Sequence, residues 1–441
     1  MRSLVSFLCL IILCLTSFAQ TINFAKLGKI TILNLAKGNY KEVAANQDKT
    51  MASKMGAENY EMIWQNLIET YDSLSFIDST LITQSDSFIF TTTKVSFQKK
   101  AFKFKINFNQ RGQICGFFIS PLVQPHSPAA YVNTLNFQEF KINVPGKITK
   151  QDGVLSLPKS TQKIPLVIIV GGSGPTDKDG TVQNNKPYKD LAWALASKGV
   201  AVYRYDKCTN YGNKNLKEIT IKDEYLIDLK AIVKRFKNHP KIDATRIVLM
   251  GHSLGGHLIP YFAKHITGFA GYIGLAANFN GLLELLPMQL NYLDSLNGFK
   301  NKATTASIIN QLKYTQANLA QTNLNPDSIP FGLTQKYLYS LEQNGPKVHG
   351  VYLKFKPILF IQGKRDYQVP YQETEYWINT LPKTSTSTIY LYPDLNHLLM
   401  QGKGTPSAAE YSQPSNIPEF VILDIMEWLK QIKPLKKFSF G

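Results

Sequence analysis

The hydrophobic pattern divides the chain into two parts that predict different architectures. Between residues 24 and 71, apolar side chains recur every three to four positions, which is the spacing of one buried helix face. Between residues 88 and 119, they alternate with polar side chains or form short runs of β-branched and aromatic residues, as strands do. Helices followed by a meander of strands predict a small α+β accessory domain over residues 20–125. Three prolines predict a linker around its end: Pro121, Pro125 and Pro128.

Residues 126–441 alternate strand and helix patterns, which is typical of a mostly parallel sheet flanked by helices. The predicted strands are 140–144, 154–157, 165–170, 200–203, 247–250, 272–275, 357–361 and 388–391. The predicted helices are 188–197, 225–236, one that follows residue 253, 371–381 and 419–432. The alternation stops over residues 281–350, where helical stretches predict a cap inserted into this domain. The predicted fold class is therefore α/β, preceded by the small α+β domain.

The first nineteen residues predict a signal peptide that is not part of the fold. Arg2 supplies a positive charge, an apolar run follows from Leu4 to Leu15, and small residues stand at Ser17 and Ala19 before the expected cleavage. The apolar run is short for a bilayer span, although an uncleaved N-terminal anchor is the alternative. We expect an exported protein, periplasmic or extracellular, with no stable membrane insertion after cleavage.

The composition excludes a disordered chain and gives little support to nucleic-acid binding. Of the 441 residues, 44% are hydrophobic and 18% are charged, which is ample apolar material for a large core. The net charge of +18 is spread along the chain, without a long Lys/Arg block or zinc-finger spacing. We therefore expect a solvated basic surface and no nucleic-acid partner.

Only two cysteines, Cys115 and Cys208, remain after the expected cleavage. Two cysteines in an exported chain of this size do not form a disulfide framework. We expect buried free thiols, with a single bridge between the two domains as the alternative.

The sharpest chemical signal is the segment from Gly251 to Gly256, which reads Gly-His-Ser-Leu-Gly-Gly. A strand pattern precedes it and an amphipathic helix pattern follows, which is the context of a nucleophile elbow with Ser253 as the nucleophile. Small residues around the serine let strand and helix come close together. The alternative is an ordinary strand-to-helix turn in which the serine caps the helix.

A serine hydroxyl needs a general base, and the base needs an acid that orients it. Asp366 directly follows the predicted strand 357–361, and His397 follows the last predicted strand. The chain order Ser, Asp, His is that of a hydrolase with a nucleophile elbow. Other candidates are placed less well, because they flank the serine, share the histidine loop, or lie in the cap or the linker: His252, His257, Asp394, His349 and His126.

An oxyanion hole requires two backbone N–H groups facing the tetrahedral intermediate. Leu254, which follows the nucleophile, supplies the first in this type of fold. The loop after strand 165–170 supplies the second, and we expect Ser173 to be the donor, with Gly172 next. Asp177 and Asp179 follow this loop, but no third ligand at metal-binding spacing accompanies them, so an acidic turn bracing the loop is expected.

At this point the chain resembles the α/β-hydrolase superfamily, and within it a group of secreted bacterial carboxylesterases. The resemblance rests on six stretches over roughly residues 140–435: 172–180, 185–192, 202–207, 251–256, 363–370 and 396–398. It implies an eight-strand type of sheet with Ser253, Asp366 and His397 as the triad. Cys208 departs from the pattern, since an arginine is expected there. The front segment resembles a cystatin-like or nuclear-transport-factor-like domain, through residues 37–40 and 112–119.

These features predict a serine hydrolase that cleaves carboxylic esters with short or medium acyl chains through an acyl-enzyme. We expect the cap to line the acyl pocket, and we expect no metal or organic cofactor. An exopeptidase or acyl thioesterase with the same triad is the enzymatic alternative. An exopeptidase would need an acidic residue for the substrate's amino terminus, and the cap offers four: Glu284, Asp294, Asp327 and Glu342. The non-enzymatic alternative is a binding protein with a vestigial hydrolase part.

Overall fold

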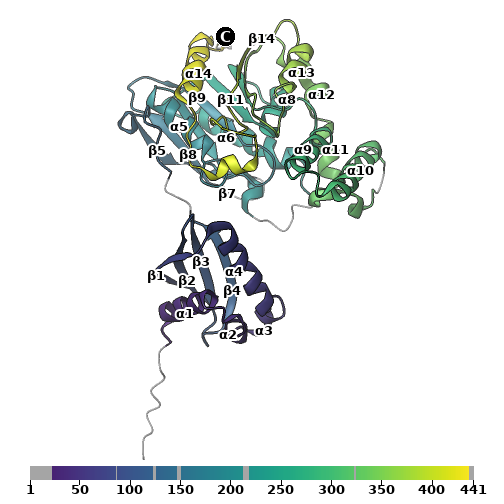
Figure 1. Cartoon of the computed structure of the whole chain (residues 1–441). Helices are drawn as coiled ribbons and strands as arrows, with labels where there is room; N and C mark the ends of the chain where they lie inside the picture. The colour runs from purple at the N-terminus through teal and green to yellow at the C-terminus, as the bar shows by residue number, and fades with distance from the viewer. Residues whose placement is uncertain are drawn as a thin grey trace, which may run out of the picture. The chain divides into compact units, whose positions relative to one another are not determined.

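In the computed structural model, the chain forms two compact units, residues 1–123 and 124–441 (Figure 1). The structure describes residues 22–85, 87–122, 126–146, 150–211, 218–321 and 324–436. The division falls two residues before the expected boundary at 125/126. The expected signal peptide over residues 1–19 lies outside the described residues.

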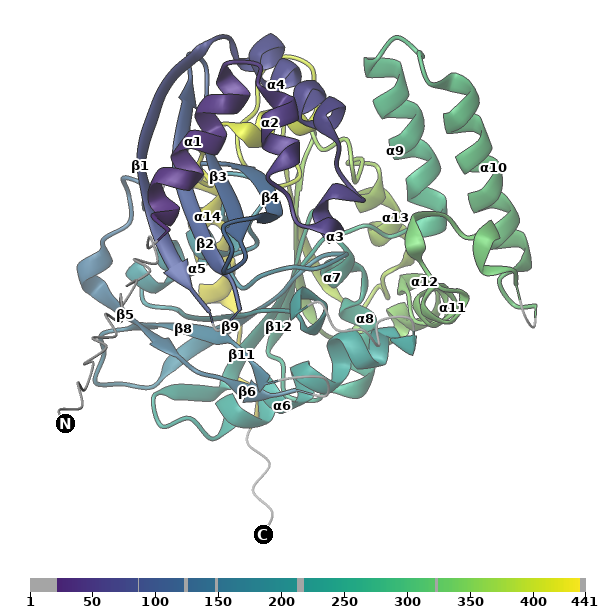
Figure 2. The same cartoon turned by 90° about the horizontal axis from the view of Figure 1, so that it is seen from below.

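The front unit packs its helices on one face of an antiparallel sheet. Its helices are α1 Phe24–Ala36, α2 Tyr40–Ala45, α3 Lys49–Ala52 and α4 Ala57–Tyr71. Its strands, in sheet order, are β1 Leu74–Gln84, β2 Ile89–Phe97, β3 Ala101–Phe108 and β4 Ile114–Pro121. On β3, Phe102, Phe104 and Phe108 are buried against the helices, while Lys103 and Lys105 point to the exposed face. This period of two gives the sheet one apolar and one polar face, and Figure 2 shows the helices lying over the sheet.

The second unit is built on an eight-stranded mixed sheet of order β14-β13-β12-β11-β9-β10-β8-β5. The strands are β5 Phe137–Lys141, β8 Gly153–Pro158, β9 Ile164–Val170, β10 Ala201–Tyr205, β11 Ile242–His252, β12 Gly271–Leu275, β13 Pro357–Gly363 and β14 Thr386–Tyr392. Strand β8 runs antiparallel to both of its neighbours, and the other pairs are parallel. A two-stranded ribbon, β6 Val144–Pro145 and β7 Lys150–Gln151, lies outside this sheet.

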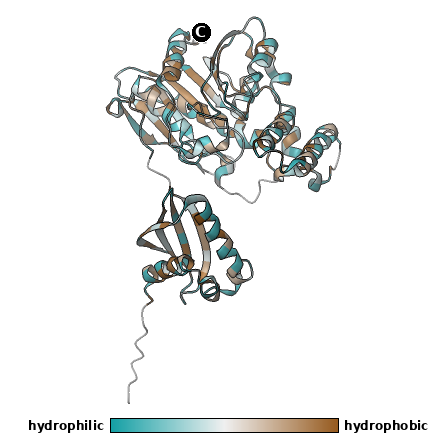
Figure 3. Cartoon of the chain, viewed as in Figure 1, coloured by the Kyte–Doolittle hydropathy of each residue, from teal (hydrophilic) through white to brown (hydrophobic). Residues whose placement is uncertain are grey.

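Helices cover both faces of this sheet, which explains why its central strands are almost wholly apolar. The helices are α5 Pro187–Ser197, α6 Ile227–Lys237, α7 Leu254–His257, α8 Ile259–His265, α13 Glu373–Thr380 and α14 Glu419–Gln431. Helices α5 and α14 pack on one face and α6, α8 and α13 on the other, and alternate side chains of β9 belong to the two core clusters beneath them. The strands accordingly form the brown centre of this unit in Figure 3. Shorter helical turns are η1 Thr134–Asn136, η2 Cys208–Tyr211, η4 Lys222–Leu226, η5 Pro326–Ser328, η6 Pro330–Gly332, η7 Gly350–Leu353 and η8 Ala408–Ser412.

The segment 281–350 forms a helical insertion with its own small core. Its helices are α9 Leu282–Leu296, α10 Lys302–Asn318, α11 Gln335–Glu342 and α12 Pro346–His349. Helices α9 and α10 lie side by side in both ribbon views. Leu283 of α9, Leu312 of α10 and Leu338 of α11 are buried together in one cluster. No helix among the described residues is long and apolar enough to cross a bilayer.

Candidate active site

Ser253 lies in a sharp turn between β11 and α7, with φ 53° and ψ −121°. Such a positive φ strains a residue with a side chain and lifts the hydroxyl clear of the neighbouring backbone. A Cβ atom built on Gly251 would lie 2.3 Å from Gly255 O, and one built on Gly255 would lie 2.5 Å from Val170 O. Glycine is therefore required at both positions for strand, turn and helix to come this close.

Asp366 and His397 meet across the ends of neighbouring strands. Asp366 follows β13 and His397 follows β14, and their side chains form a 2.7 Å hydrogen bond between Oδ2 and Nδ1. The other carboxylate oxygen, Oδ1, accepts the backbone N–H groups of Gln368 and Val369, both at 2.9 Å. Gln362 donates a further hydrogen bond to Oδ2 at 3.2 Å. The carboxylate is thus buried, fully bonded and fixed in one orientation toward the imidazole.

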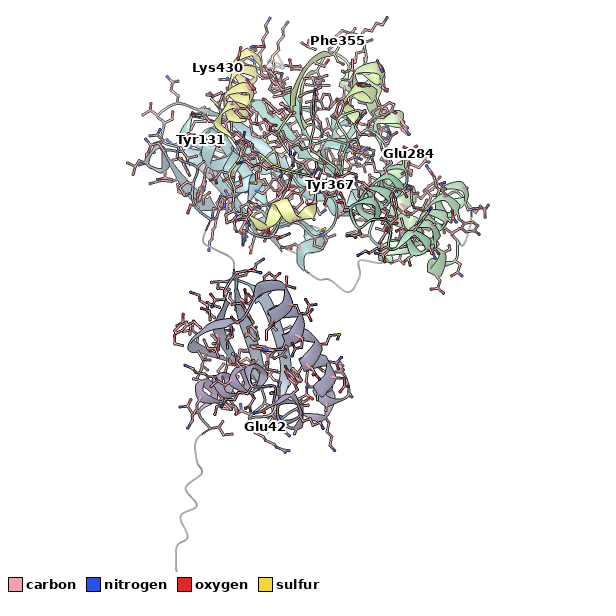
Figure 4. All side chains as sticks on the ribbon, viewed as in Figure 1. Glu42, Tyr131, Glu284, Phe355, Tyr367 and Lys430 are labelled. Carbon is pink, nitrogen blue, oxygen red and sulfur yellow. The ribbon has the colours of Figure 1, made fainter. Side chains whose placement is uncertain are left out.

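Ser253 and His397 both line one cavity of about 300 Å³. The other lining residues are Gly172, Ser173, Pro175, Thr176, Gly180, Thr181, Val182, Pro187, Tyr188, His252, Tyr367, Gln368, Leu398 and Tyr411. Tyr367 is labelled in Figure 4. Both side chains are described, and they form no direct hydrogen bond with each other, as is often the case before substrate binds.

The three expected oxyanion residues surround Ser253. Leu254 begins α7, where a backbone N–H has no partner within the helix. A Cβ built on Gly172 would lie 3.1 Å from Ser253 Cβ, so this loop passes directly beside the serine. The N–H of Gly172 donates to Tyr188 Oη at 3.3 Å. The N–H of Ser173 has no acceptor in the described part of the chain.

His252 lines the cavity next to Ser253, and both of its ring nitrogens have partners within the protein. Its Nδ1 is 3.0 Å from Tyr188 Oη, and its Nε2 is 2.9 Å from the His397 carbonyl oxygen. Burial, with a smaller contribution from His397, lowers the pKa of His252 to about 3. Burial likewise lowers the pKa of His257 to about 4. Both rings are therefore neutral at neutral pH and serve packing and hydrogen bonding.

These two buried histidines make the protein less stable in acid. The unfolded chain binds protons at both positions below its histidine pKa of about 6.5, whereas the folded chain does not until about pH 4 for His257 and about pH 3 for His252. The free energy of unfolding should therefore fall by about 2 kcal/mol per histidine between pH 7 and pH 5. Urea unfolding of the protein and of a His257→Gln variant at both pH values measures this effect. An unchanged pH dependence in the variant would contradict it.

In the acidic turn after the oxyanion loop, both carboxylates, Asp177 and Asp179, have partners within the protein. Asp177 accepts hydrogen bonds from the N–H and the hydroxyl of Thr181. Asp179 pairs with Lys186 at 2.8 Å and with Arg204 at 3.1 Å. Burial raises the pKa of Asp179, but these two cations outweigh it and lower the value overall. The described residues contain no group of three or more His, Cys, Asp or Glu side chains that could hold a metal ion.

The remaining rival histidines and the cysteines have structural positions. His126 Nε2 lies 2.7 Å from Asp190 on α5, and His349 Nε2 lies 3.0 Å from Asn344. Cys115 and Cys208 are both free. Burial raises the pKa of the Cys208 thiol to about 12, so it is no nucleophile at neutral pH.

The expectation that the cap lines the cavity is wrong for the described residues. None of the lining residues comes from 281–350. The cap instead supports the cavity wall from outside, where Tyr292 stacks on Tyr367 with ring centroids 5.6 Å apart and Gln289 donates to the Gln368 carbonyl. The physical reason is that the apolar stripe of α9 is used in the core of the cap, with Leu283 only 1% exposed.

The wall residues that received no role from sequence reasoning include Tyr188, Tyr367, Gln368 and Tyr411. The first three lie within the stretches that carry the hydrolase resemblance, and Tyr367 and Gln368 directly follow Asp366, which was a usable signal for these two. Tyr411 lies in the isolated turn η8, where no motif marks it.

Comparison with known proteins gives several matches. A family model described as Hydrolase_4, serine aminopeptidase S33, matches residues 179–403, just over half of the chain. Esterase EstD of Thermotoga maritima is 29% identical over 403 residues, which cover 90% of this chain and 93% of that protein. An acylaminoacyl peptidase structure from Pyrococcus horikoshii is 13% identical, with a TM-score of 0.47, over 85% of this chain and 58% of that one. Est1E of Butyrivibrio proteoclasticus, with bound ferulic acid, is 17% identical, with a TM-score of 0.43, over 66% and 98%. The chain thus spans less than two thirds of the length of the peptidase structure.

Proposed function

The chain belongs to the Hydrolase_4 family (serine aminopeptidase, S33), and from this premise we propose that it is a serine esterase for carboxylic esters with short to medium acyl chains. Its eight-stranded sheet, flanked by helices, has the α/β-hydrolase fold expected from the sequence. The observation that carries the proposal is that Ser253 and His397 line one cavity, while Asp366, which is not part of the lining, holds His397 at 2.7 Å.

The proposed mechanism follows from this geometry. Ser253 Oγ attacks the ester carbonyl while His397 Nε2 accepts its proton, and the hydrogen bond from Nδ1 to Asp366 fixes the tautomer that leaves Nε2 free. The N–H groups of Ser173 and Leu254 stabilise the negative charge on the carbonyl oxygen. His397 then protonates the departing alcohol. Water, activated in the same way, releases the acid from the acyl-enzyme.

The lining of the cavity favours an ester over a peptide amino terminus. None of its described lining residues is an aspartate or glutamate, whereas an exopeptidase needs a carboxylate to bind the substrate's ammonium group. The four acidic residues of the cap that could have bound the ammonium group are not part of the cavity lining. Glu284, labelled in Figure 4, pairs with Lys347 at 2.8 Å, and Asp294 accepts the N–H of Asn301. The similarity to an esterase over most of the chain supports the same choice.

A substrate panel tests the proposal. We expect p-nitrophenyl esters from acetate to octanoate to be hydrolysed faster than the palmitate ester, because a cavity of about 300 Å³ is at the small end for ligand sites. On the same plate, amino-acid p-nitroanilides and acyl thioesters should react at about one tenth of the ester rate or below it. A fluorophosphonate should label Ser253, as peptide mapping would show. Faster turnover of anilides would instead assign an exopeptidase, and faster turnover of thioesters a thioesterase.

A further inference from the structure

We propose that Lys207 and Tyr225 are positioning residues of the oxyanion hole, which hold the Gly172 carbonyl so that the Ser173 N–H faces the substrate. Lys207 Nζ donates to Gly172 O at 2.6 Å, and Tyr225 Oη donates to the same oxygen at 2.8 Å. Lys207 is 2% exposed and Tyr225 is fully buried, so water does not compete for this carbonyl. The inference rests on the proposed function, because it concerns the same catalytic site.

The geometry of the peptide bond connects this contact with catalysis. No peptide bond in the described chain is cis, so the Gly172 carbonyl and the Ser173 N–H belong to one planar trans unit and point in opposite directions. Two donors that hold the carbonyl from behind therefore fix the direction of the N–H on the other side. That N–H has no protein acceptor among the described residues, and Gly172 lies beside Ser253.

The sequence of the loop explains why such a clamp is needed. The segment from Gly171 to Gly174 is Gly-Gly-Ser-Gly, and Gly174 has a φ of +70°. Glycines allow several peptide orientations at similar energy, so the loop alone does not keep its N–H groups aimed at one point. An oxyanion hole accelerates the reaction only when its donors are oriented before the charge develops.

The clamp continues through a buried ion pair to the cap. Lys207 Nζ lies 2.9 Å from Glu224 Oε1, and Tyr337 Oη on α11 donates to Glu224 Oε2 at 2.6 Å. Glu224 and Tyr225 are neighbours in the π-helical turn η4, which lets both reach Lys207. A buried ion pair contributes little net stability compared with apolar residues of the same size. Its placement at the oxyanion loop is therefore better explained by positioning than by stability.

The experiment compares two clamp variants with a matched control. Tyr225→Phe removes one donor to the Gly172 carbonyl without changing any charge. The double variant Lys207→Met/Glu224→Gln removes the other donor without leaving Glu224 as an unpaired buried charge. Tyr203→Phe is the control, since Tyr203 Oη donates to the Ile142 carbonyl at 2.9 Å, away from the cavity. All variants are compared by thermal unfolding before their kinetics are measured.

For each clamp variant, we expect kcat for p-nitrophenyl butyrate to fall about 10- to 100-fold, a share of the loss caused by removing an oxyanion donor outright. KM should change less than about twofold, because the clamp acts on the transition state and not on the bound ester. The affinity for a trifluoromethyl ketone, which forms a tetrahedral oxyanion on the serine, should fall in the same proportion as kcat/KM. Tyr203→Phe should lose comparable stability and keep its kcat.

Three results would overturn the inference, and they differ in what else they overturn. Ester turnover by the unaltered chain, with kcat retained within about twofold in both clamp variants, would remove the positioning role and leave the esterase assignment standing. No ester turnover by the unaltered chain would remove both. A parallel loss of kcat in Tyr203→Phe would also overturn the inference, because any buried hydroxyl would then have the same effect.

Discussion

Replacing Ser253 with alanine should lower kcat for p-nitrophenyl butyrate by on the order of 10⁴- to 10⁶-fold. The variant keeps the cavity, the histidine and the oxyanion donors but has no nucleophile, so no acyl-enzyme forms. KM should change little, since the ester is bound by the cavity walls. Steady-state kinetics on homogeneous protein and loss of fluorophosphonate labelling measure the effect.

Ser197→Ala is the matched control for this substitution. Ser197 ends α5, and its hydroxyl donates to the Ala194 carbonyl at 2.9 Å, remote from the cavity lining. This variant should keep full activity and full labelling. Retention of more than about one hundredth of the activity by Ser253→Ala would show that another group is the nucleophile.

Replacing Asp366 with asparagine should lower kcat by about 10⁴-fold with little change in structure. The amide would present an N–H to His397 Nδ1, which forces the proton of the neutral ring onto Nε2. His397 could then no longer accept the proton of Ser253. The drop should appear in single-turnover acylation, which separates loss of the base from slower product release.

Asp394→Asn distinguishes a triad acid from a nearby carboxylate. Asp394 lies in the same loop as His397 and is exposed, so its substitution should change kcat less than about twofold. If Asp394→Asn were the damaging change and Asp366→Asn were tolerated, the assignment of the acid would have to be reversed.

Strands with a continuous apolar run could be predicted closely from the sequence, whereas two of the edge strands, β1 and β5, could not. The central strands β9, β12 and β13 have continuous apolar runs, and their predicted positions lie within one or two residues of the structure. Strand β1, Leu74–Gln84, was missed because it is an edge strand whose side chains are mostly exposed and show no alternation. Strand β5, the other sheet's edge, lies three residues before its predicted position for the same reason.

Local motifs indicated the candidate triad, but only the fold shows which buried residues hold the neighbouring loop in place. Ser253, Asp366 and His397 each follow a recognisable strand, and parallel strands place their carboxyl ends on one edge of the sheet. Lys207 ends the stretch 202–207 that carries the hydrolase resemblance, but its burial has no signal in the sequence, because a lysine in a loop is normally exposed. Its burial against Gly172 depends on how η4 packs, which involves contacts between segments distant in the sequence.

The position of the site at the ends of β9, β11, β13 and β14 also has a consequence for how activity appears during folding. These strands pair only through parallel crossovers, and 144 residues separate Ser253 from His397 along the chain. Parallel pairing between distant segments forms late, after the local helices and turns. A fragment that ends before β14 lacks His397 and cannot hold the three side chains together. The recovery of hydrolysis after denaturation therefore reports the last step of sheet assembly. The recovery of the helical circular dichroism signal reports only the beginning of folding.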